Sequence, residues 1–301
     1  MATPAAPHSS AALGAVYAVA AAVLFSTAGL IVRRIDLPAW DISFWRSVFL
    51  VAAMLPILLW QWRRVVLDAV RAGTALLLSA VLLSGSFVAF ILALGHAPVA
   101  NVLIMFGATP FVTALGARLY LGEPLHRHTL IAMSVAVVGL ALSVAGSLQA
   151  GAIFGMALAG IVVLCMGGNY VVVRSRRDIG MVPAIALAGA ISGLVALPFA
   201  TPGDLRIEQI GWVLTLSPGQ LGGGLLLYMA ALKRIPAGRA ALLGLLELVL
   251  GPIWVWVFDG EKPDDLTLAG GAIVIAAAAV NVWLDSRPRL RLPGPLAKNE
   301  T

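Results

Sequence analysis

The chain has 301 residues, of which 60% are hydrophobic and only 11% are charged, with a formal net charge of +6 and a mean hydropathy of +0.98. Soluble domains carry about 25% charged residues, so this composition excludes an ordinary soluble protein and indicates a chain solvated by lipid. The basic residues cluster at the ends of apolar stretches, which excludes a nucleic-acid-binding surface and is typical of membrane orientation.

Ten apolar stretches are long enough to cross a hydrocarbon layer of about 30 Å. We expect them at 12–32, 42–61, 74–95, 98–119, 129–147, 151–172, 182–200, 210–232, 237–258 and 266–284. We expect the first stretch to be a transmembrane helix that is retained in the protein and not a signal peptide that is cleaved. Because backbone polar groups in lipid must bond internally and no barrel alternation is present, we predict an all-α membrane protein with ten transmembrane helices.

The distribution of basic residues predicts the orientation of these helices. With the N-terminus inside, 15 of the 20 Lys and Arg residues fall on the cytoplasmic side. The positive-inside rule then places both termini in the cytoplasm. The excess of Arg over Lys, with abundant Ala and Gly, suggests a bacterial source and hence the inner membrane.

The second half of the chain repeats the first at an offset of 138 residues. The matching segments are Ser84-Gly85-Ser86 with Gly222-Gly223-Gly224, Pro98 with Pro236, and Gly122-Glu123 with Gly260-Glu261. Five helices per repeat is an odd number, so the second repeat enters the membrane inverted, as in many secondary transporters. We expect the first repeat at 1–148, the second at 149–286, and a cytoplasmic tail at 287–301.

These features resemble the drug/metabolite transporter superfamily. The sequences LGEP at 121–124 and DGEK at 259–262 are similar to the ends of EamA-type repeats, although Lys262 replaces the proline of the first copy. The resemblance implies an exporter that works by alternating access, with bacterial exporters of amino acids and metabolites, including aromatic amino acids, as the nearest group. The expected partners are a small-molecule substrate and the surrounding lipid, and because the repeats are self-contained we expect the chain to function as a monomer.

Glu247 is the acidic residue that lies deepest in any predicted span. A charge at the bilayer centre costs at least about 2.5 kcal/mol, so the side chain should face a cavity or a partner. We expect it to bind a substrate amine or a coupling proton. The alternative is a structural carboxylate that pairs with another helix.

Other candidate substrate-binding residues are aromatic or amide side chains inside spans. They are Tyr17, Trp45, Phe87, Phe90, Asn101, Asn169, Tyr228 and Trp254. Aromatic side chains suit an apolar ligand cavity, but they also form interfacial belts. Buried amides also bond neighbouring helices to each other, which is the more ordinary role for Asn101 and Asn169.

Glycines and prolines predict where helices break or bend. The candidate hinge residues are Ser84, Gly85, Ser86, Gly222, Gly223, Gly224, Pro110 and Pro252. Matched Gly interruptions in two repeats indicate a central site, whereas the alternative is close helix packing through small residues. Arg46, near the outer end of the second span, could bind a carboxylate, but a snorkelling anchor at the interface is the favoured interpretation.

Enzyme and metal functions find little support in the sequence. The four histidines lie in termini or loops, Asp pairs are absent from the spans, and the single cysteine, Cys165, permits neither a disulfide nor a zinc site. We therefore expect no cofactor and no metal. A channel would need a repeated pore, leaving a proton-coupled exporter of cationic drugs as the main alternative.

Overall fold

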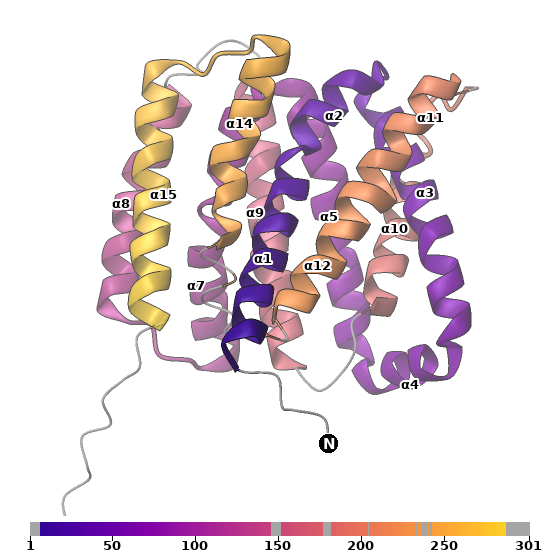
Figure 1. Cartoon of the computed structure of the whole chain (residues 1–301), viewed down its shortest axis with the longest axis horizontal. Helices are drawn as coiled ribbons and strands as arrows, with labels where there is room; N and C mark the ends of the chain where they lie inside the picture. Colours follow the sequence, from indigo (N-terminus) through magenta and orange to yellow (C-terminus); the bar gives the residue numbers. More distant parts are fainter. Residues whose placement is uncertain are drawn as a thin grey trace, which may run out of the picture.

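Every regular element in the described part of the chain is a helix (Figure 1). The computed structural model describes residues 7–145, 152–176, 182–203, 205–232, 234–235, 240 and 243–286. The expected boundary between repeats near 148, most of the segment between α12 and α14, and the expected tail at 287–301 lie outside these ranges.

Helices of the first half follow the predicted order, but two predicted spans are each divided into two helices and one further helix, α4 (Trp62–Ala72), is present. They are α1 (Pro7–Ser26), α2 (Ala28–Ile35), α3 (Ala39–Trp60), α4 (Trp62–Ala72), α5 (Thr74–His96), α6 (Val99–Phe106), α7 (Thr109–Leu121) and α8 (Arg127–Ala145). The first predicted span is divided into α1 and α2, and the fourth into α6 and α7.

Helices of the second half show a similar pattern. They are α9 (Ala152–Ser175), α10 (Val182–Ala196), α11 (Ile207–Leu214), the π-helix η1 (Thr215–Gly222), α12 (Gly223–Leu232), α14 (Leu246–Asp259) and α15 (Asp265–Ser286). Eight helical stretches of the described chain are long and apolar enough to cross a membrane, and α10 contributes a shorter apolar helix. The described part of the ninth predicted span is α14.

The helix α4 was not predicted, because its residues are a mixture of charged and apolar types. It lies across one end of the bundle, at a steep angle to its neighbours (Figure 1). Its apolar side chains Val66, Leu67 and Val70 are exposed, as are Arg63 and Arg64. An exposed amphipathic helix with several Arg residues and a Trp at its start is typical of a segment that lies in the membrane interface.

The long spans are interrupted at places that partly match the predicted hinges. Pro110 lies in the first turn of α7, just after the break at Gly107 and Ala108, as expected for a residue without a backbone N–H. Gly222 ends η1, whose register change precedes α12. Pro252 lies inside α14, which continues through it.

The expected break at Ser84-Gly85-Ser86 is wrong, because α5 is one continuous helix from Thr74 to His96. Small residues here serve packing instead. A Cβ atom added to Gly85 would lie 3.1 Å from the Sγ of Cys165 in α9. The small-residue interpretation therefore holds for Ser84-Gly85-Ser86, whereas the equivalent helix of the second repeat contains the π-helix η1.

Each main contact between two helices has a counterpart in which both helices are replaced by their equivalents from the other half of the chain. The contact of α5 with α9 corresponds to that of α12 with α1, and the contact of α7 with α9 corresponds to that of α14 with α1. Likewise α10 packs on α5, and η1 packs on α3. The halves are therefore interleaved, and the first helices of the two repeats, α1 and α9, contact helices of the opposite repeat.

Candidate functional site

Glu247 lies in the first turn of α14, immediately after the interruption at Leu245. The N-terminal end of a helix carries a partial positive charge, which favours a carboxylate at this position even within the membrane. The side chain is half-buried. Among the described residues it makes no hydrogen bond and no ion pair, so the alternative of a carboxylate paired with a described residue of another helix is not supported.

Two tyrosines lie in the same region as this carboxylate. Tyr170 of α9 and Tyr228 of α12 both lie within electrostatic range of Glu247. Tyr17 of α1 and Tyr228 pack against the same small apolar cluster, which includes Ala18 and Ala231. The predicted residues Tyr17, Tyr228 and Glu247 are thus brought into one region, where α1, α9, α12 and α14 meet.

Tyr170 was missed by the sequence analysis, although it follows Asn169 directly. The residue is 44% exposed. A phenol ring in the region of Glu247 offers both an aromatic face and a hydroxyl group. The sequence did contain a signal, because Tyr170 is the one aromatic residue near the end of the sixth span and directly follows the candidate Asn169.

Asn101 and Asn169 connect helices to one another. The Asn101 amide nitrogen donates to the carbonyl oxygen of Ser143 at 3.0 Å and to the hydroxyl of Thr267 at 3.2 Å, which joins α6 to α8 and α15. The Ser79 hydroxyl donates to the Asn169 side-chain oxygen at 2.6 Å, joining α5 to α9. These bonds favour the structural role for both amides.

The remaining aromatic candidates lie in separate places. The Trp254 indole donates to the Ser26 hydroxyl at 2.9 Å, which ties α14 to the break between α1 and α2. Trp45 packs on the main apolar core beside Phe44. The aromatic residues proposed from the sequence therefore do not form one continuous lining.

Phe87 and Phe90 of α5 instead cover Arg46 of α3. The guanidinium carbon lies 5.2 Å from the centroid of the Phe87 ring and 5.9 Å from that of Phe90. Arg46 is only 5% exposed. The favoured interpretation of Arg46 as a snorkelling anchor is therefore wrong, because its side chain points between helices and not toward the interface.

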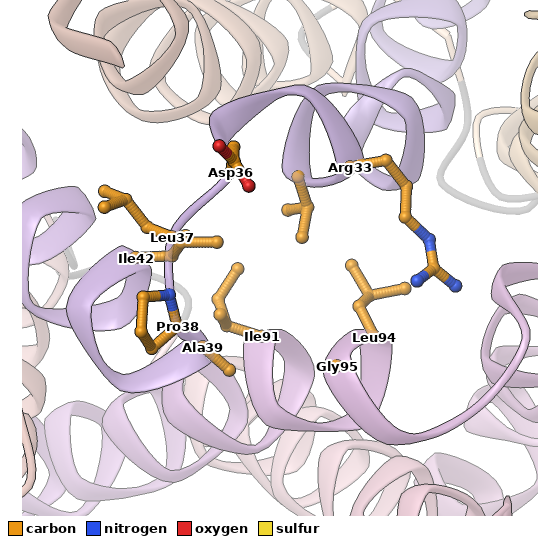
Figure 2. A pocket seen from close by; sticks show the side chains of 10 residues that line it. Arg33, Asp36, Leu37, Pro38, Ala39, Ile42, Ile91, Leu94 and Gly95 are labelled. Atoms are coloured by element: carbon orange, nitrogen blue, oxygen red, sulfur yellow. The ribbon is translucent and has the colours of Figure 1, made fainter. Parts of the chain in front are cut away.

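A pocket of about 330 Å³ opens at the end of the bundle where α2, α3 and α5 meet (Figure 2). Arg33 and Asp36 contribute charges to its wall, whereas Ile42, Ile91 and Leu94 contribute apolar side chains. Nothing in the sequence pattern marked these residues as a group, since they come from three helices. No three His, Cys, Asp or Glu side chains of the described residues gather as metal ligands.

Comparisons with known proteins agree with this architecture. The family model described as "EamA-like transporter family" matches the chain twice, at residues 12–145 and 153–283. The pseudopaline exporter CntI of Pseudomonas aeruginosa, found in strains UCBPP-PA14 and PAO1, is 28% identical over 276 residues, which cover 88% of this chain and 94% of the relative.

A protein of known crystal structure shares the fold. It superposes with a TM-score of 0.64 at 20% sequence identity, covering 91% of this chain and 99% of that chain. Since the two family matches together span most of the sequence, the chain belongs to the EamA-like transporter family of the drug/metabolite transporter superfamily, and it is a multi-pass membrane transporter, not an enzyme.

Proposed function

We propose that this transporter exports small amphipathic metabolites from a bacterial cell by alternating access, with aromatic and apolar amino acids as the first candidates. The single observation that carries the proposal is Glu247, a carboxylate without a partner among the described residues, at a helix interruption beside two tyrosines. Such a carboxylate can take the ammonium group of a substrate or a coupling proton.

The mechanism proposed here requires two inverted repeats, 1–148 and 149–286, with ten spans and both termini in the cytoplasm. Support comes from the paired helix contacts and from the helix ends. The N-terminal end of α1, the connection from α7 to α8, and α4 all lie at one end of the bundle, while the end of α2 lies at the other (Figure 1). The first end carries Arg63, Arg64, Arg71 and Arg174, as the positive-inside rule requires of a cytoplasmic face.

Similarity to a pseudopaline exporter supports export of a metabolite and leaves the identity of the cargo open. The aromatic rings of Tyr17, Tyr170 and Tyr228 near Glu247 suit a substrate with an apolar body and a positive head group. The same rings would also accept a cationic drug exchanged for protons, which makes a proton-coupled drug exporter the second candidate.

Counterflow into proteoliposomes tests the proposal. Vesicles preloaded with one unlabelled amino acid would be given labelled leucine, phenylalanine, tryptophan, lysine or glutamate. We expect accumulation of the apolar and aromatic set, and a loss of roughly tenfold or more with Glu247→Gln, because a charge-assisted bond is replaced by a weaker one. Glu208→Gln is the matched control, since Glu208 is exposed in the first turn of α11.

The outcomes separate the candidates. Counterflow at the native rate with Glu247→Gln would remove the proposed role of that carboxylate. Proton movement that follows addition of a cationic drug, in the absence of amino-acid counterflow, would favour the drug exporter.

A further inference from the structure

Arg46 is a buried cation without a counter-ion among the described residues. Of its three guanidinium nitrogens only Nη1 has a hydrogen-bond partner there, the Phe87 carbonyl oxygen at a distance of 3.4 Å. Nε is fully buried and bonded to nothing in the described part of the chain. Burying an uncompensated charge costs several kcal/mol, so the position requires a partner at some stage of the protein's working cycle.

The surroundings of Arg46 are prepared for a planar anion. Phe87 and Phe90 lie against the guanidinium and hold it in place. The Ser217 hydroxyl of η1 donates to the Arg46 carbonyl oxygen at 2.7 Å, which fixes the backbone of α3 against η1. A guanidinium held in this way presents its N–H groups in a fork that matches the two oxygens of a carboxylate.

A second buried polar atom without a partner lies on the helix that contacts Arg46. Gln220 lies three residues after Ser217 in η1 and is 5% exposed. Its Nε2 donates to the Phe25 carbonyl oxygen at 3.2 Å, while its Oε1 has no partner among the described residues. The packing of η1 on α3 therefore places a second unsatisfied polar group on the helix that adjoins Arg46. π-helical turns frequently occur at functional sites.

The wall of the pocket shown in Figure 2 includes residues one helical turn from Arg46 and from Phe87. Ile42 precedes Arg46 by four residues on α3, and Ile91 follows Phe87 by four residues on α5. Residues four apart share a helix face. Ile42 and Ile91, in the pocket wall, therefore lie one turn along α3 and α5 from Arg46 and Phe87. A modest movement of α3 against α5 would connect the pocket to the guanidinium.

From these observations we propose that Arg46 forms a subsite for the carboxylate of the transported molecule, reached through the pocket between α2, α3 and α5. The inference rests on the proposed function in that the ligand is cargo, and it adds that the cargo carries a carboxylate. The carboxylate subsite does not depend on whether Glu247 binds an amine or a proton, because Arg46 lies on α3 and Glu247 lies on α14.

Binding to the wild-type protein tests the subsite without any substitution. Thermal unfolding of the purified transporter in detergent would be followed with acids and their uncharged amides as probes: 3-phenylpropionate with 3-phenylpropanamide, octanoate with octanamide, and L-phenylalanine with L-phenylalaninamide. We expect at least one acid to raise the unfolding temperature and to bind roughly tenfold or more tightly than its amide. Equal stabilisation by every acid and its amide, or none by any acid, would overturn the proposal.

Substitutions then assign the preference to Arg46. With Arg46→Gln, the preference for the acid should disappear, and Arg46→Lys should keep part of it because the charge remains without the fork. Arg63→Gln is the matched control, since Arg63 also lies over an aromatic ring, Trp62, at 5.5 Å but is exposed. An unchanged preference in a folded Arg46→Gln protein would place the carboxylate elsewhere.

Failure of the subsite and failure of the proposed function give different results. Counterflow that accepts L-phenylalanine and L-phenylalaninamide equally would keep the exporter and remove the subsite. A preference for acids in the unfolding assay that depends on Arg46, with no counterflow of any amino acid, would keep the subsite and remove amino acids as cargo.

Discussion

The Nη2 of Arg33 lies 3.0 Å from the Oε2 of Glu261, which joins the end of α2 to the turn between α14 and α15. The opposite end of the bundle has an equivalent pair, in which the Nη2 of Arg174 lies 2.6 Å from the Oε2 of Glu123. Glu123 and Glu261 are separated by the repeat offset of 138, and Arg174 aligns with Arg33 at an offset of 141. Each pair therefore connects one half of the chain to the other, at opposite ends of the fold.

Breaking one pair should shift the balance between conformations open to the two sides. Exposed ion pairs contribute about 0.2–1 kcal/mol, so Arg33→Glu should change the ratio of conformers by up to about fivefold, in favour of opening at the α2 end. The shift can be measured by maleimide labelling of a cysteine in the pocket wall, introduced as Ile42→Cys in a Cys165→Ala background. Opening at the α2 end should make this cysteine react faster.

A substitution in the equivalent ion pair at the other end of the bundle provides the control. Arg174→Glu should slow labelling at the same cysteine, since it favours opening at the other end. The double exchange Arg33→Glu with Glu261→Arg should restore the original rate. Labelling that responds equally to Arg33→Glu and Arg174→Glu would contradict a gating role for these pairs.

The helical architecture was predictable because hydrophobic length and the Gly-Glu turns depend on local sequence. Eight of the ten predicted spans coincide with helices of the described chain that are long and apolar enough to cross a membrane, and the two family matches cover the two predicted repeats. The site was only partly predictable, since burial is decided by packing between distant helices. Arg46 looked like an interfacial anchor from its distance to the end of α3, yet the two rings of α5 and the π-helix η1 enclose it. Nothing in one sequence indicates that Phe87 and Arg46 are neighbours.

The hydroxyl of Tyr170 should contribute to transport through its proximity to Glu247. Tyr170→Phe keeps the ring and removes the hydroxyl, so we expect a loss of roughly three- to tenfold in counterflow, the range for one hydrogen-bonding group. Tyr120→Phe is the matched control, because Tyr120 of α7 is 72% exposed. Equal activity of both variants would show that the Tyr170 hydroxyl does not act at the site.

Close packing between α8 and α15 should make glycine essential at Gly139. A Cβ atom there would lie 2.7 Å from the Gly270 carbonyl oxygen and 2.9 Å from a methyl group of Val274. Backbone cannot move aside cheaply, so Gly139→Ala should lower the free energy of unfolding by about 1–3 kcal/mol. Gly211→Ala in α11, where no atom lies within 4 Å of the added group, should be neutral or slightly stabilising. Thermal unfolding in detergent distinguishes the two, and similar midpoints would refute the packing argument.

Asp264, in the turn before α15, should make stability depend on pH in the acid range. Its carboxylate accepts hydrogen bonds from the Thr267 backbone amide at 2.9 Å and from the Thr267 hydroxyl at 2.5 Å. Although desolvation acts in the opposite direction, these bonds hold the pKa of Asp264 below its usual value.

A lowered pKa in the folded state means that the folded protein binds fewer protons than the unfolded chain in this range. The resulting stabilisation is complete above about pH 4, the ordinary pKa of Asp, and is lost as the pH falls through the lower pKa of the folded state. Thr267 also receives a hydrogen bond from Asn101, so protonation of Asp264 should loosen the junction of α6, α8 and α15.

Asp264→Asn removes the titrating group and should flatten the fall in unfolding temperature between about pH 4 and pH 2, while lowering stability at neutral pH. Asp265→Asn is the control, because the neighbouring exposed carboxylate makes no bond to Thr267. If the wild-type protein and Asp264→Asn lose stability in parallel as the pH falls, then other carboxylates set the acid limit. If only the Asp264 variant is insensitive, the turn between α14 and α15 is the acid-sensitive junction of this transporter.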